Sequence, residues 1–321
     1  MMEPYILHVG DCRETLARIP DQSVNCVVTS PPYFGLRDYG MESQIGLEPT
    51  PEQYVAEMVA VFREVRRVLR DDGTVWLNIG DSYAGSGKGL YADGKSHPKE
   101  GDKQSTNVGS LDVLHHVVET LPAKNLLGIP WRVAFALQAD GWYLRQDIIW
   151  HKPNVMPESV TDRCTKSHEY LFLLAKSERY HYDADAIREP LAESSVERVK
   201  YGWKSDRPSV KSGPGGIDVE EMGERFANPN GRNKRSVWTV VPAQFAGAHF
   251  AVMPEALVEP CILAGCPVGG TVLDPFTGSG TVGVVAMRAH RQFVGCELNP
   301  AYAEMARERI ESHIGLFNTN A

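Results

Sequence analysis

The sequence is poor in cysteine and contains no long apolar run. Its six cysteines are spread over 321 residues without a Cys-x-x-Cys pair, which argues against a disulfide framework and against a zinc site. No stretch of about 18 apolar residues is present, as a membrane-spanning helix requires, and the first residues lack the basic and apolar segments of a signal peptide. We therefore expect reduced thiols, no metal, no membrane association and a cytoplasmic location.

The chain also lacks an excess of positive charge. Its formal net charge is −8 at pH 7, so the whole surface is not one that attracts nucleic acid. Residues 194–240 nevertheless contain nine Lys and Arg against six Asp and Glu, a local charge of +3 in a chain whose remainder is strongly acidic. A basic segment on an acidic body is typical of a protein that contacts nucleic acid through one region.

Hydrophobic patterning predicts an α/β fold. Hydrophobic residues make up 42% of the chain, an ordinary share for a globular protein with a sizeable core. Apolar segments bounded by turn residues predict strands at residues 5–9, 23–28, 74–79, 147–150, 169–175, 271–274 and 293–297. Apolar residues at helical spacing predict helices at residues 51–70, 126–139, 255–264, 281–289 and 301–313. Strands that alternate with helices in this way predict a doubly wound, mostly parallel sheet.

Two segments show no regular pattern. Residues 84–110 are rich in Gly, Lys and Ser, and we expect a mobile loop there, because structureless loops of this length are usually functional or disordered. Residues 186–235 are likewise irregular and carry most of the local basic excess. We therefore expect one α/β domain made of residues 1–185 and 236–321, with residues 186–235 inserted into it.

A glycine-rich motif follows a predicted strand and opens a predicted helix. It consists of Asp274, Pro275, Phe276, Thr277, Gly278, Ser279, Gly280 and Thr281. Glycines at such a turn let the backbone approach a ligand that faces the N–H groups of the helix. Glu297 ends the next strand, where its carboxylate can accept hydrogen bonds from two ribose hydroxyls. NAD would fit the same pattern, but Asp274 would repel a pyrophosphate and would favour a cationic cofactor.

A second motif, Ser30-Pro31-Pro32-Tyr33, stands directly after a predicted strand, at the strand end where α/β sheets bind ligands. The exocyclic amine of cytosine or adenine is a poor nucleophile, because its lone pair is delocalised into the ring. Ser30 Oγ and the Pro31 carbonyl can accept the two amine protons, and the prolines fix the backbone that aims these acceptors. Tyr33 offers a ring on which a base turned out of the duplex can stack. Taken alone, the motif also fits a Pro-Pro turn that ends a strand.

With both motifs in one chain, the sequence resembles the β group of DNA amino-methyltransferases over nearly its whole length. In that group the catalytic motif precedes the cofactor motif, as Ser30–Tyr33 precedes Asp274–Thr281 here. Further segments that fit are Gly10–Cys12, Trp150–Asn154, His168–Tyr170 and His249–Phe250. The resemblance implies a Rossmann-like fold of the S-adenosylmethionine methyltransferase type, with S-adenosyl-L-methionine as methyl donor and S-adenosyl-L-homocysteine as product.

The resemblance also implies the site residues. Those expected to act in catalysis are Ser30, Pro31, Pro32 and Tyr33. Those expected to bind the cofactor are Asp11, Cys12, Thr29, His249, Phe250, Asp274, Pro275, Phe276, Gly278, Ser279, Gly280, Thr281, Glu297 and Asn299. In this family a serine at the first position of the catalytic motif is most typical of enzymes that methylate cytosine N4, so Ser30 favours cytosine N4, with adenine N6 as the alternative.

Family members place their target-recognition region where residues 186–235 stand in this chain. The residues expected to contact DNA are Arg198, Lys200, Lys204, Arg207, Arg232, Asn233, Lys234 and Arg235. Lys and Arg can bind phosphates, and Arg can read guanine edges. The expected partner is double-stranded DNA, and a homodimer and a cognate restriction endonuclease are further possible partners. An NAD-dependent oxidoreductase and a non-catalytic DNA-binding protein remain as alternatives, although each leaves one of the two motifs unexplained.

Overall fold

The computed structural model describes residues 4–85, 121–155, 157–158, 160–191, 231–243 and 252–318, with side chains to residue 314. The chain divides into two compact units. The larger unit comprises Met1–Tyr182 and Ser236–Ala321, and the smaller unit comprises Asp183–Arg235. Most of the predicted loop at residues 84–110 lies outside the described residues, as do His249, Phe250 and four of the expected DNA contacts, namely Arg198, Lys200, Lys204 and Arg207.

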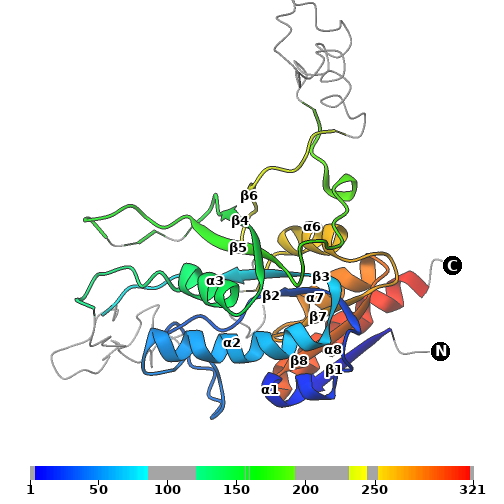
Figure 1. The fold of residues 1–321 in the computed structure, drawn as a ribbon, viewed down its shortest axis with the longest axis horizontal. Helices are drawn as coiled ribbons and strands as arrows, with labels where there is room; N and C mark the ends of the chain where they lie inside the picture. The colour runs from blue at the N-terminus through cyan, green and yellow to red at the C-terminus, as the bar shows by residue number, and fades with distance from the viewer. Residues whose placement is uncertain are drawn as a thin grey trace, which may run out of the picture. The chain divides into compact units, whose positions relative to one another are not determined.

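The larger unit is built on an eight-stranded sheet in the order β1-β8-β7-β2-β3-β5-β4-β6 (Figure 1). All neighbouring pairs are parallel except the two that β5 forms with β3 and β4. In chain order the strands are β1 (Tyr5–Val9), β2 (Val24–Thr29), β3 (Leu69–Ile79), β4 (Tyr143–His151), β5 (His168–Ala175), β6 (Val237–Thr239), β7 (Thr271–Asp274) and β8 (Gln292–Glu297). The predicted α/β fold with a mostly parallel sheet is confirmed.

Helices cover both faces of this sheet, as a doubly wound fold requires (Figure 1). Helices α1 (Cys12–Thr15), α2 (Pro51–Val68) and α3 (Ile129–Ala139) pack together as one layer, and α6 (Glu255–Gly265), α7 (Thr281–Arg288) and α8 (Pro300–Asn318) pack together as the other. Short 3₁₀ turns lie at Leu16–Arg18 (η1) and at Asp185–Ile187 (η2). No helix in the described parts of the chain is long and apolar enough to cross a membrane.

Helix α2 shows how the sequence determines one of these layers. Thr50 caps its first turn by accepting a hydrogen bond from the Gln53 backbone, and Pro51 stands at the start, where its missing N–H costs nothing. The buried positions recur at helical spacing and form one apolar stripe, made of Tyr54, Met58, Val61, Phe62, Val65 and Val68. This stripe packs into the main core, where burial of each large side chain contributes about 2 kcal/mol.

The predicted end of this helix was wrong by two residues. Residues 51–70 were expected to be helical, but α2 ends at Val68, and Leu69 already has an extended backbone. Leu69 opens β3 by pairing with Val24 of β2, and the register then shifts before Cys26 pairs with Thr74. Pairing between distant strands, which local helical spacing cannot show, therefore decides where the helix stops.

Strand β4 is longer than predicted, and β6 was not predicted as a strand. Residues 147–150 were expected, whereas β4 runs from Tyr143 to His151 because it pairs with β5 along its whole length across one register shift. Several of its outer positions are exposed, so they lack the apolar signal that marks a strand. Strand β6 is only three residues long and pairs with β4.

The smaller unit is described only at its two ends. Glu189 and Arg232 form an isolated antiparallel bridge with two backbone hydrogen bonds of 2.9 Å. Arg188 adds hydrogen bonds to the Gly231 carbonyl at 3.1 Å and to Asn233 Oδ1 at 2.9 Å. These contacts tie the entry of the unit to its exit, so the residues between them form an excursion from one place in the chain.

Candidate active site

The carboxyl ends of seven sheet positions bring the predicted motifs into one row. In sheet order the row begins with Asp11 after β1, Glu297 at the end of β8 and Asp274 at the end of β7. It continues with Ser30 after β2 and Asn78 near the end of β3. Strand β5 runs the other way, so its first residues, including Glu169, lie at this same edge, beside Lys152 after β4. One pocket lies along the row, and all seven residues line it.

The row has two parts of different chemistry. Three carboxylates stand at one end, and we call them the acidic half: Asp11, Asp274 and Glu297. Hydroxyl, amide and charged groups stand at the other end, and we call them the tyrosine cluster: Ser30, Tyr33, Asn78, Lys152 and Glu169. Both groups line the same pocket, so a ligand held by the acidic half can face one held by the tyrosine cluster.

Asp274 is the most buried charge of the acidic half, with 1% of its surface exposed. Its Oδ1 accepts hydrogen bonds from Thr29 Oγ1 at 2.6 Å and from the Phe276 backbone at 3.0 Å. Both donors are neutral, and burial raises the pKa of this carboxyl to about 7, although the two hydrogen bonds oppose the increase. A buried carboxylate without a cationic partner among these donors favours a positively charged ligand.

Glu297 is held by backbone N–H groups on both of its oxygens. Its Oε2 accepts from Gly278 at 2.7 Å and its Oε1 from Asn299 at 2.8 Å. Burial nevertheless raises the pKa of Glu297 above its usual value. Each carboxylate oxygen can accept a further hydrogen bond, so Glu297 can still receive the two hydroxyls of a ribose.

The turn between β7 and α7 requires its glycines. Gly280 caps α7 with a left-handed backbone, at a φ of 80°. A Cβ there would lie 2.9 Å from the Cα of Ala306 in α8, closer than packed atoms tolerate. Gly278 also has a positive φ of 53°. Only glycine adopts such conformations readily, and the turn therefore brings its backbone N–H groups close to the pocket.

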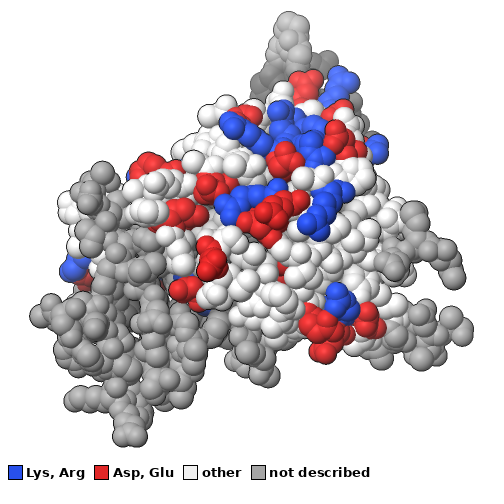
Figure 2. Space-filling model, turned by 90° about the horizontal axis from the view of Figure 1, so that it is seen from below, with Lys and Arg blue, Asp and Glu red and all other residues white. Residues whose placement is uncertain are grey.

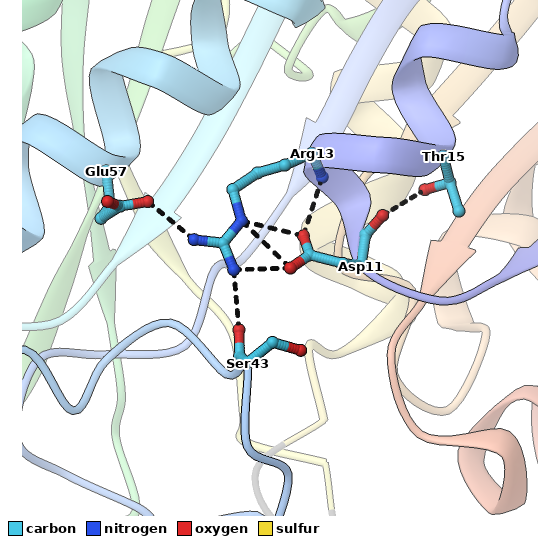
Figure 3. A network of polar contacts seen from close by, with 5 residues as sticks. All are labelled: Asp11, Arg13, Thr15, Ser43 and Glu57. Carbon is cyan, nitrogen blue, oxygen red and sulfur yellow. Dashed lines mark hydrogen bonds and ion pairs between the residues drawn. The ribbon is translucent and has the colours of Figure 1, made fainter.

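Asp11 is engaged by Arg13, which links three segments of the chain (Figure 3). The Arg13 backbone donates to Asp11 Oδ1 at 2.9 Å, and the guanidinium lies against both carboxylate oxygens. The same guanidinium donates to the Ser43 carbonyl at 3.0 Å and to Glu57 of α2 at 2.8 Å. Burial would raise the pKa of Asp11, but the bonds from Arg13 outweigh it and lower that pKa.

The segment Ser30–Tyr33 is fixed from two sides. Tyr54 of α2 donates its phenolic hydrogen to the Pro32 carbonyl at 2.8 Å, so this carbonyl is occupied and the Pro31 carbonyl is the better candidate acceptor for a substrate. The Tyr33 ring packs against the backbone of Gly80, where a Cβ would lie 2.5 Å from Tyr33 Cε2. Gly80 therefore gives the ring one backbone-lined side.

The Tyr33 hydroxyl is the centre of the tyrosine cluster. It lies 2.7 Å from Glu169 Oε2, 3.2 Å from Asn78 Oδ1 and 3.4 Å from Ser30 Oγ. Burial raises the pKa of Tyr33 well above its ordinary value, and the Glu169 carboxylate raises it further. The phenol therefore keeps its proton and donates it to Glu169.

Glu169 is held in place by two further donors. Asn78 Nδ2 lies 3.3 Å from Glu169 Oε2 and also donates to the Tyr170 carbonyl at 3.1 Å. Lys152 forms an ion pair with Glu169 Oε1, and its ammonium lies 4.2 Å from the centre of the Trp150 ring. Both side chains of the ion pair are largely buried, so their charges are weakly screened by solvent.

Most of the predicted site residues meet in this one pocket. Those that line it are Asp11, Cys12, Ser30, Pro31, Pro32, Tyr33, Asp274, Pro275, Phe276, Gly278, Ser279, Thr281, Glu297 and Asn299. Thr29 acts one step behind, through its bond to Asp274, and Gly280 shapes the turn.

Sequence reasoning assigned no role to Asn78, Lys152 or Glu169. The segments Trp150–Asn154 and His168–Tyr170 did match the family pattern, and this match is the signal that could have found Lys152 and Glu169. Their contacts with Tyr33 depend on sheet order, which the match does not reveal.

The predicted DNA contacts that the structure describes lie in the smaller unit. Arg232 and Arg235 share the Glu189 carboxylate, each with a distance of 3.2 Å to Oε2. The Arg235 side chain is 69% exposed and the Arg232 side chain 38%. Arg235 is therefore the more accessible cation of the two.

Charged side chains of the larger unit are extensively paired. Arg63 binds Asp140 at 2.6 Å, and Arg132 binds Glu52 at 2.8 Å. On the face drawn in Figure 2, the coloured basic side chains lie beside acidic ones. The described residues of that face thus form no broad basic surface, in keeping with the acidic body that the sequence predicts.

The fold and the pocket together define a class of protein. A glycine-rich turn, a buried aspartate suited to a cation and a ribose-binding glutamate fit S-adenosyl-L-methionine, whose sulfonium and ammonium groups are positive. A pyrophosphate would meet the Asp274 carboxylate instead. The site is thus that of an S-adenosylmethionine-dependent methyltransferase, with a second group of polar residues facing the methyl donor.

Comparison with known proteins identifies the family. The N6/N4 family model, described as DNA methylase, matches residues 24–308, and the chain belongs to this family of DNA amino-methyltransferases. The type II methyltransferase M.Cfr9I of Citrobacter freundii is 47% identical over 305 residues, which are 95% of this chain and 87% of that protein. M.XycI of Xanthomonas campestris pv. cyanopsidis is 48% identical over 314 residues, which are 96% of this chain and 90% of that protein.

Solved structures agree with the family and with the cofactor. A DNA modification methylase of Thermus thermophilus in complex with S-adenosyl-L-methionine has a TM-score of 0.56 at 25% identity, over 97% of this chain and 96% of that one. The PvuII DNA methyltransferase, which is cytosine-N4-specific, shares the fold with a TM-score of 0.59 at 18% identity, over 98% and 93% of the chains. The protein is therefore an S-adenosylmethionine-dependent DNA methyltransferase, and neither an oxidoreductase nor a non-catalytic DNA-binding protein.

Proposed function

We propose that the base methylated by this enzyme is cytosine, at its exocyclic N4. The observation that supports this choice is Ser30, a neutral hydroxyl at the first position of the catalytic motif, in the pocket and beside Tyr33. In the family that the sequence resembles, serine at this position is most typical of cytosine-N4 enzymes. Adenine N6 is the alternative, because serine can accept a hydrogen bond from either amine.

The proposed roles follow the two halves of the pocket. Asp274 favours the positive charge of the cofactor, Glu297 binds its ribose, and Asp11 lies toward its adenine, as expected from its place beyond Glu297 in the sheet. The cofactor supplies a methyl group on a positively charged sulfur. The acidic half holds and orients this group toward the tyrosine cluster.

The target base enters the tyrosine cluster after it leaves the duplex. Enzymes that act on a base in DNA take it out of the stack, because the reacting atom is otherwise unreachable. The Tyr33 ring is backed by Gly80 and offers its other face for stacking. Ser30 Oγ and the Pro31 carbonyl accept the amine protons, which draws the nitrogen toward tetrahedral geometry and frees its lone pair for the methyl group.

Residues 186–235 are proposed to read the target sequence. The basic residues expected there would bind phosphates and base edges, and Arg235 is the most accessible of those that the structure describes. Because the relatives are type II methyltransferases, we propose that methylation protects the target sequence from a cognate restriction endonuclease.

The test uses unmodified genomic DNA and S-adenosyl-L-methionine with a deuterated methyl group. After reaction the DNA is digested to nucleosides and analysed by mass spectrometry. Labelled N4-methylcytosine is the expected product, and labelled N6-methyladenine would overturn the choice of base while leaving the reaction class intact. Enzyme with Ser30→Ala is the matched control, and should give little of either product.

A further inference from the structure

Three hydrogen-bonding groups lead from the proposed reaction centre to a carboxylate on another strand. Ser30 Oγ lies 3.4 Å from Tyr33 Oη, and Tyr33 Oη lies 2.7 Å from Glu169 Oε2. Ser30 follows β2 and Glu169 belongs to β5, with β3 between these strands. The contacts therefore cross the sheet edge inside the pocket, where all three residues line the wall.

The contacts have a direction that follows from donor and acceptor capacity. A carboxylate can only accept, so the single Tyr33 hydrogen goes to Glu169. Tyr33 Oη can then accept the hydrogen of Ser30. With its hydrogen directed toward Tyr33, Ser30 Oγ turns its lone pairs toward the pocket, where they can accept an amine proton of the base.

Glu169 is built to stay in place at the end of this series. Lys152 pairs with its Oε1, and Asn78 Nδ2 lies 3.3 Å from its Oε2. Its side chain is 16% exposed, so it is shielded from bulk water but not sealed from the pocket. A carboxylate fixed in this way keeps the Tyr33 hydroxyl and, through it, the Ser30 hydroxyl in one orientation.

We propose that Glu169 is a positioning residue and the final proton acceptor for methyl transfer, acting on the base through Tyr33 and Ser30. This inference rests on the proposed function, because it needs an exocyclic amine at Ser30. It assigns a role to a residue outside the two sequence motifs.

The proposed step balances in atoms and charge. The amine nitrogen forms a bond to the methyl carbon as the sulfur–carbon bond breaks, and the sulfonium becomes a neutral thioether. The nitrogen, now positively charged, gives a proton to Ser30 Oγ, while the Ser30 hydrogen moves to Tyr33 and the Tyr33 hydrogen moves to Glu169. The base ends neutral and methylated, Glu169 ends protonated, and water removes that proton after product release.

The contact between Ser30 and Tyr33 is long at 3.4 Å. Catalytic hydrogen bonds are often long before the substrate binds and shorten in the reacting complex. An amine that pulls on the Ser30 oxygen would orient the Ser30 hydrogen further toward Tyr33, which shortens the weakest link of the series.

The test is a double-mutant cycle with Glu169→Gln and Tyr33→Phe. Each variant keeps the shape of the side chain and breaks the series at one point. We expect each to lower the single-turnover rate of methyl transfer about 100-fold, within the usual range for loss of acid–base assistance. In the double variant the loss should stay within about threefold of the single losses, because both changes interrupt one series.

Two binding measurements separate this role from a merely structural one. Cofactor affinity by calorimetry, and the fluorescence of a 2-aminopurine placed at the mapped target position, should both stay within about threefold of wild type. Loss of either signal in parallel with the rate would show that Glu169 only supports the fold of the pocket. Multiplicative losses of about 10,000-fold in the double variant would also overturn the proposal.

Matched variants guard against misfolding and against general charge effects. Lys152→Met combined with Glu169→Gln removes both buried charges, and it should fold and remain as slow as Glu169→Gln alone. Glu64→Gln removes a paired glutamate on α2 that does not line the pocket, and should keep the wild-type rate. If wild-type enzyme methylates no base, the proposed function fails; if it does and Glu169→Gln stays within about fivefold of it, only this inference fails.

Discussion

The acidic half and the tyrosine cluster share one pocket but are held together over very different distances in the chain. Asp11, Asp274 and Glu297 each accept a hydrogen bond from the backbone N–H two residues further on, at 2.8 to 3.0 Å. Tyr33, in contrast, meets Asn78 across 45 residues and Glu169 across 136. The acidic half is therefore set largely by local turns, whereas the tyrosine cluster exists only once the sheet has formed.

This difference explains how much of the site the sequence reveals. A carboxylate at a strand end, followed by a glycine-rich turn, is a contiguous pattern that fixes local geometry, so the placement of Asp274 and Glu297 in the pocket could be predicted. Lys152 and Glu169 carry no such local signal. Their meeting with Tyr33 depends on β5 running against its neighbours and on its place between β3 and β4.

The strongest way to break the acidic half is Asp274→Asn. The change keeps the shape of the side chain and removes the buried charge that favours a cationic cofactor. Loss of a charge-assisted interaction of about 3 kcal/mol should weaken S-adenosyl-L-methionine binding about 100-fold, measured by calorimetry. The Tyr33→Phe variant is the control from the tyrosine cluster and should bind the cofactor normally. An Asp274→Asn variant with unchanged affinity would contradict the role of the acidic half.

A change of pH should act on the same carboxylate with a smaller effect. The pKa of Asp274 in the protein without ligand is about 7, and a cationic cofactor favours the ionised form. Affinity should therefore fall as the pH falls, by about tenfold from about pH 8 to about pH 6, because the cofactor must displace a proton. Calorimetry over this range tests the sign, and Asp274→Asn should flatten the profile. An affinity that rises toward the acidic end would be inconsistent with this assignment.

The same raised pKa has a consequence for the free protein. Between the ordinary value of 3.8 and about 7, the folded state binds more protons at this site than the unfolded chain. The contribution of Asp274 to stability therefore falls as the pH rises through this window. The cofactor should recover part of this loss, so the thermal stabilisation that it gives should be larger at about pH 8 than at about pH 6.

Arg13→Met tests whether the acidic half needs its outer support. The substitution removes the contacts to Asp11, to the Ser43 carbonyl and to Glu57 while keeping much of the apolar stem. We expect a loss of about 1 kcal/mol in stability, seen as a melting temperature lower by about 2 °C, and cofactor binding weakened about fivefold. Methyl transfer at saturating cofactor should remain near wild type, and a large loss there would place Arg13 in the chemistry.

The smallest expected effect lies outside the pocket, at Arg235. Arg235→Ala removes an accessible cation from the proposed recognition region. It should weaken DNA binding only a few-fold and reduce the salt dependence of binding by about one unit of slope. Fluorescence anisotropy with a labelled duplex at several salt concentrations measures both quantities. Arg307→Ala on α8 is the matched control, and an identical slope in the two variants would argue against a DNA contact at Arg235.

The fold followed from the sequence more fully than the ends of its elements did. Alternating apolar strands and helices predict the parallel sheet, because burial on both faces leaves a clear composition signal, as in β2. The exposed positions of β4 and the early stop of α2 at Val68 carry no such signal. In both places pairing with a distant strand overrides the local pattern.

The most direct test of the division of labour in the pocket is to measure cofactor affinity and methyl-transfer rate side by side for Ser30→Ala. Ser30 lies next to Asp274 in the row of strand ends but belongs to the tyrosine cluster. The variant should bind S-adenosyl-L-methionine within about threefold of wild type and lose about 100- to 1,000-fold in single-turnover methyl transfer to DNA. Full activity in this variant, or loss of cofactor binding together with the rate, would contradict the account.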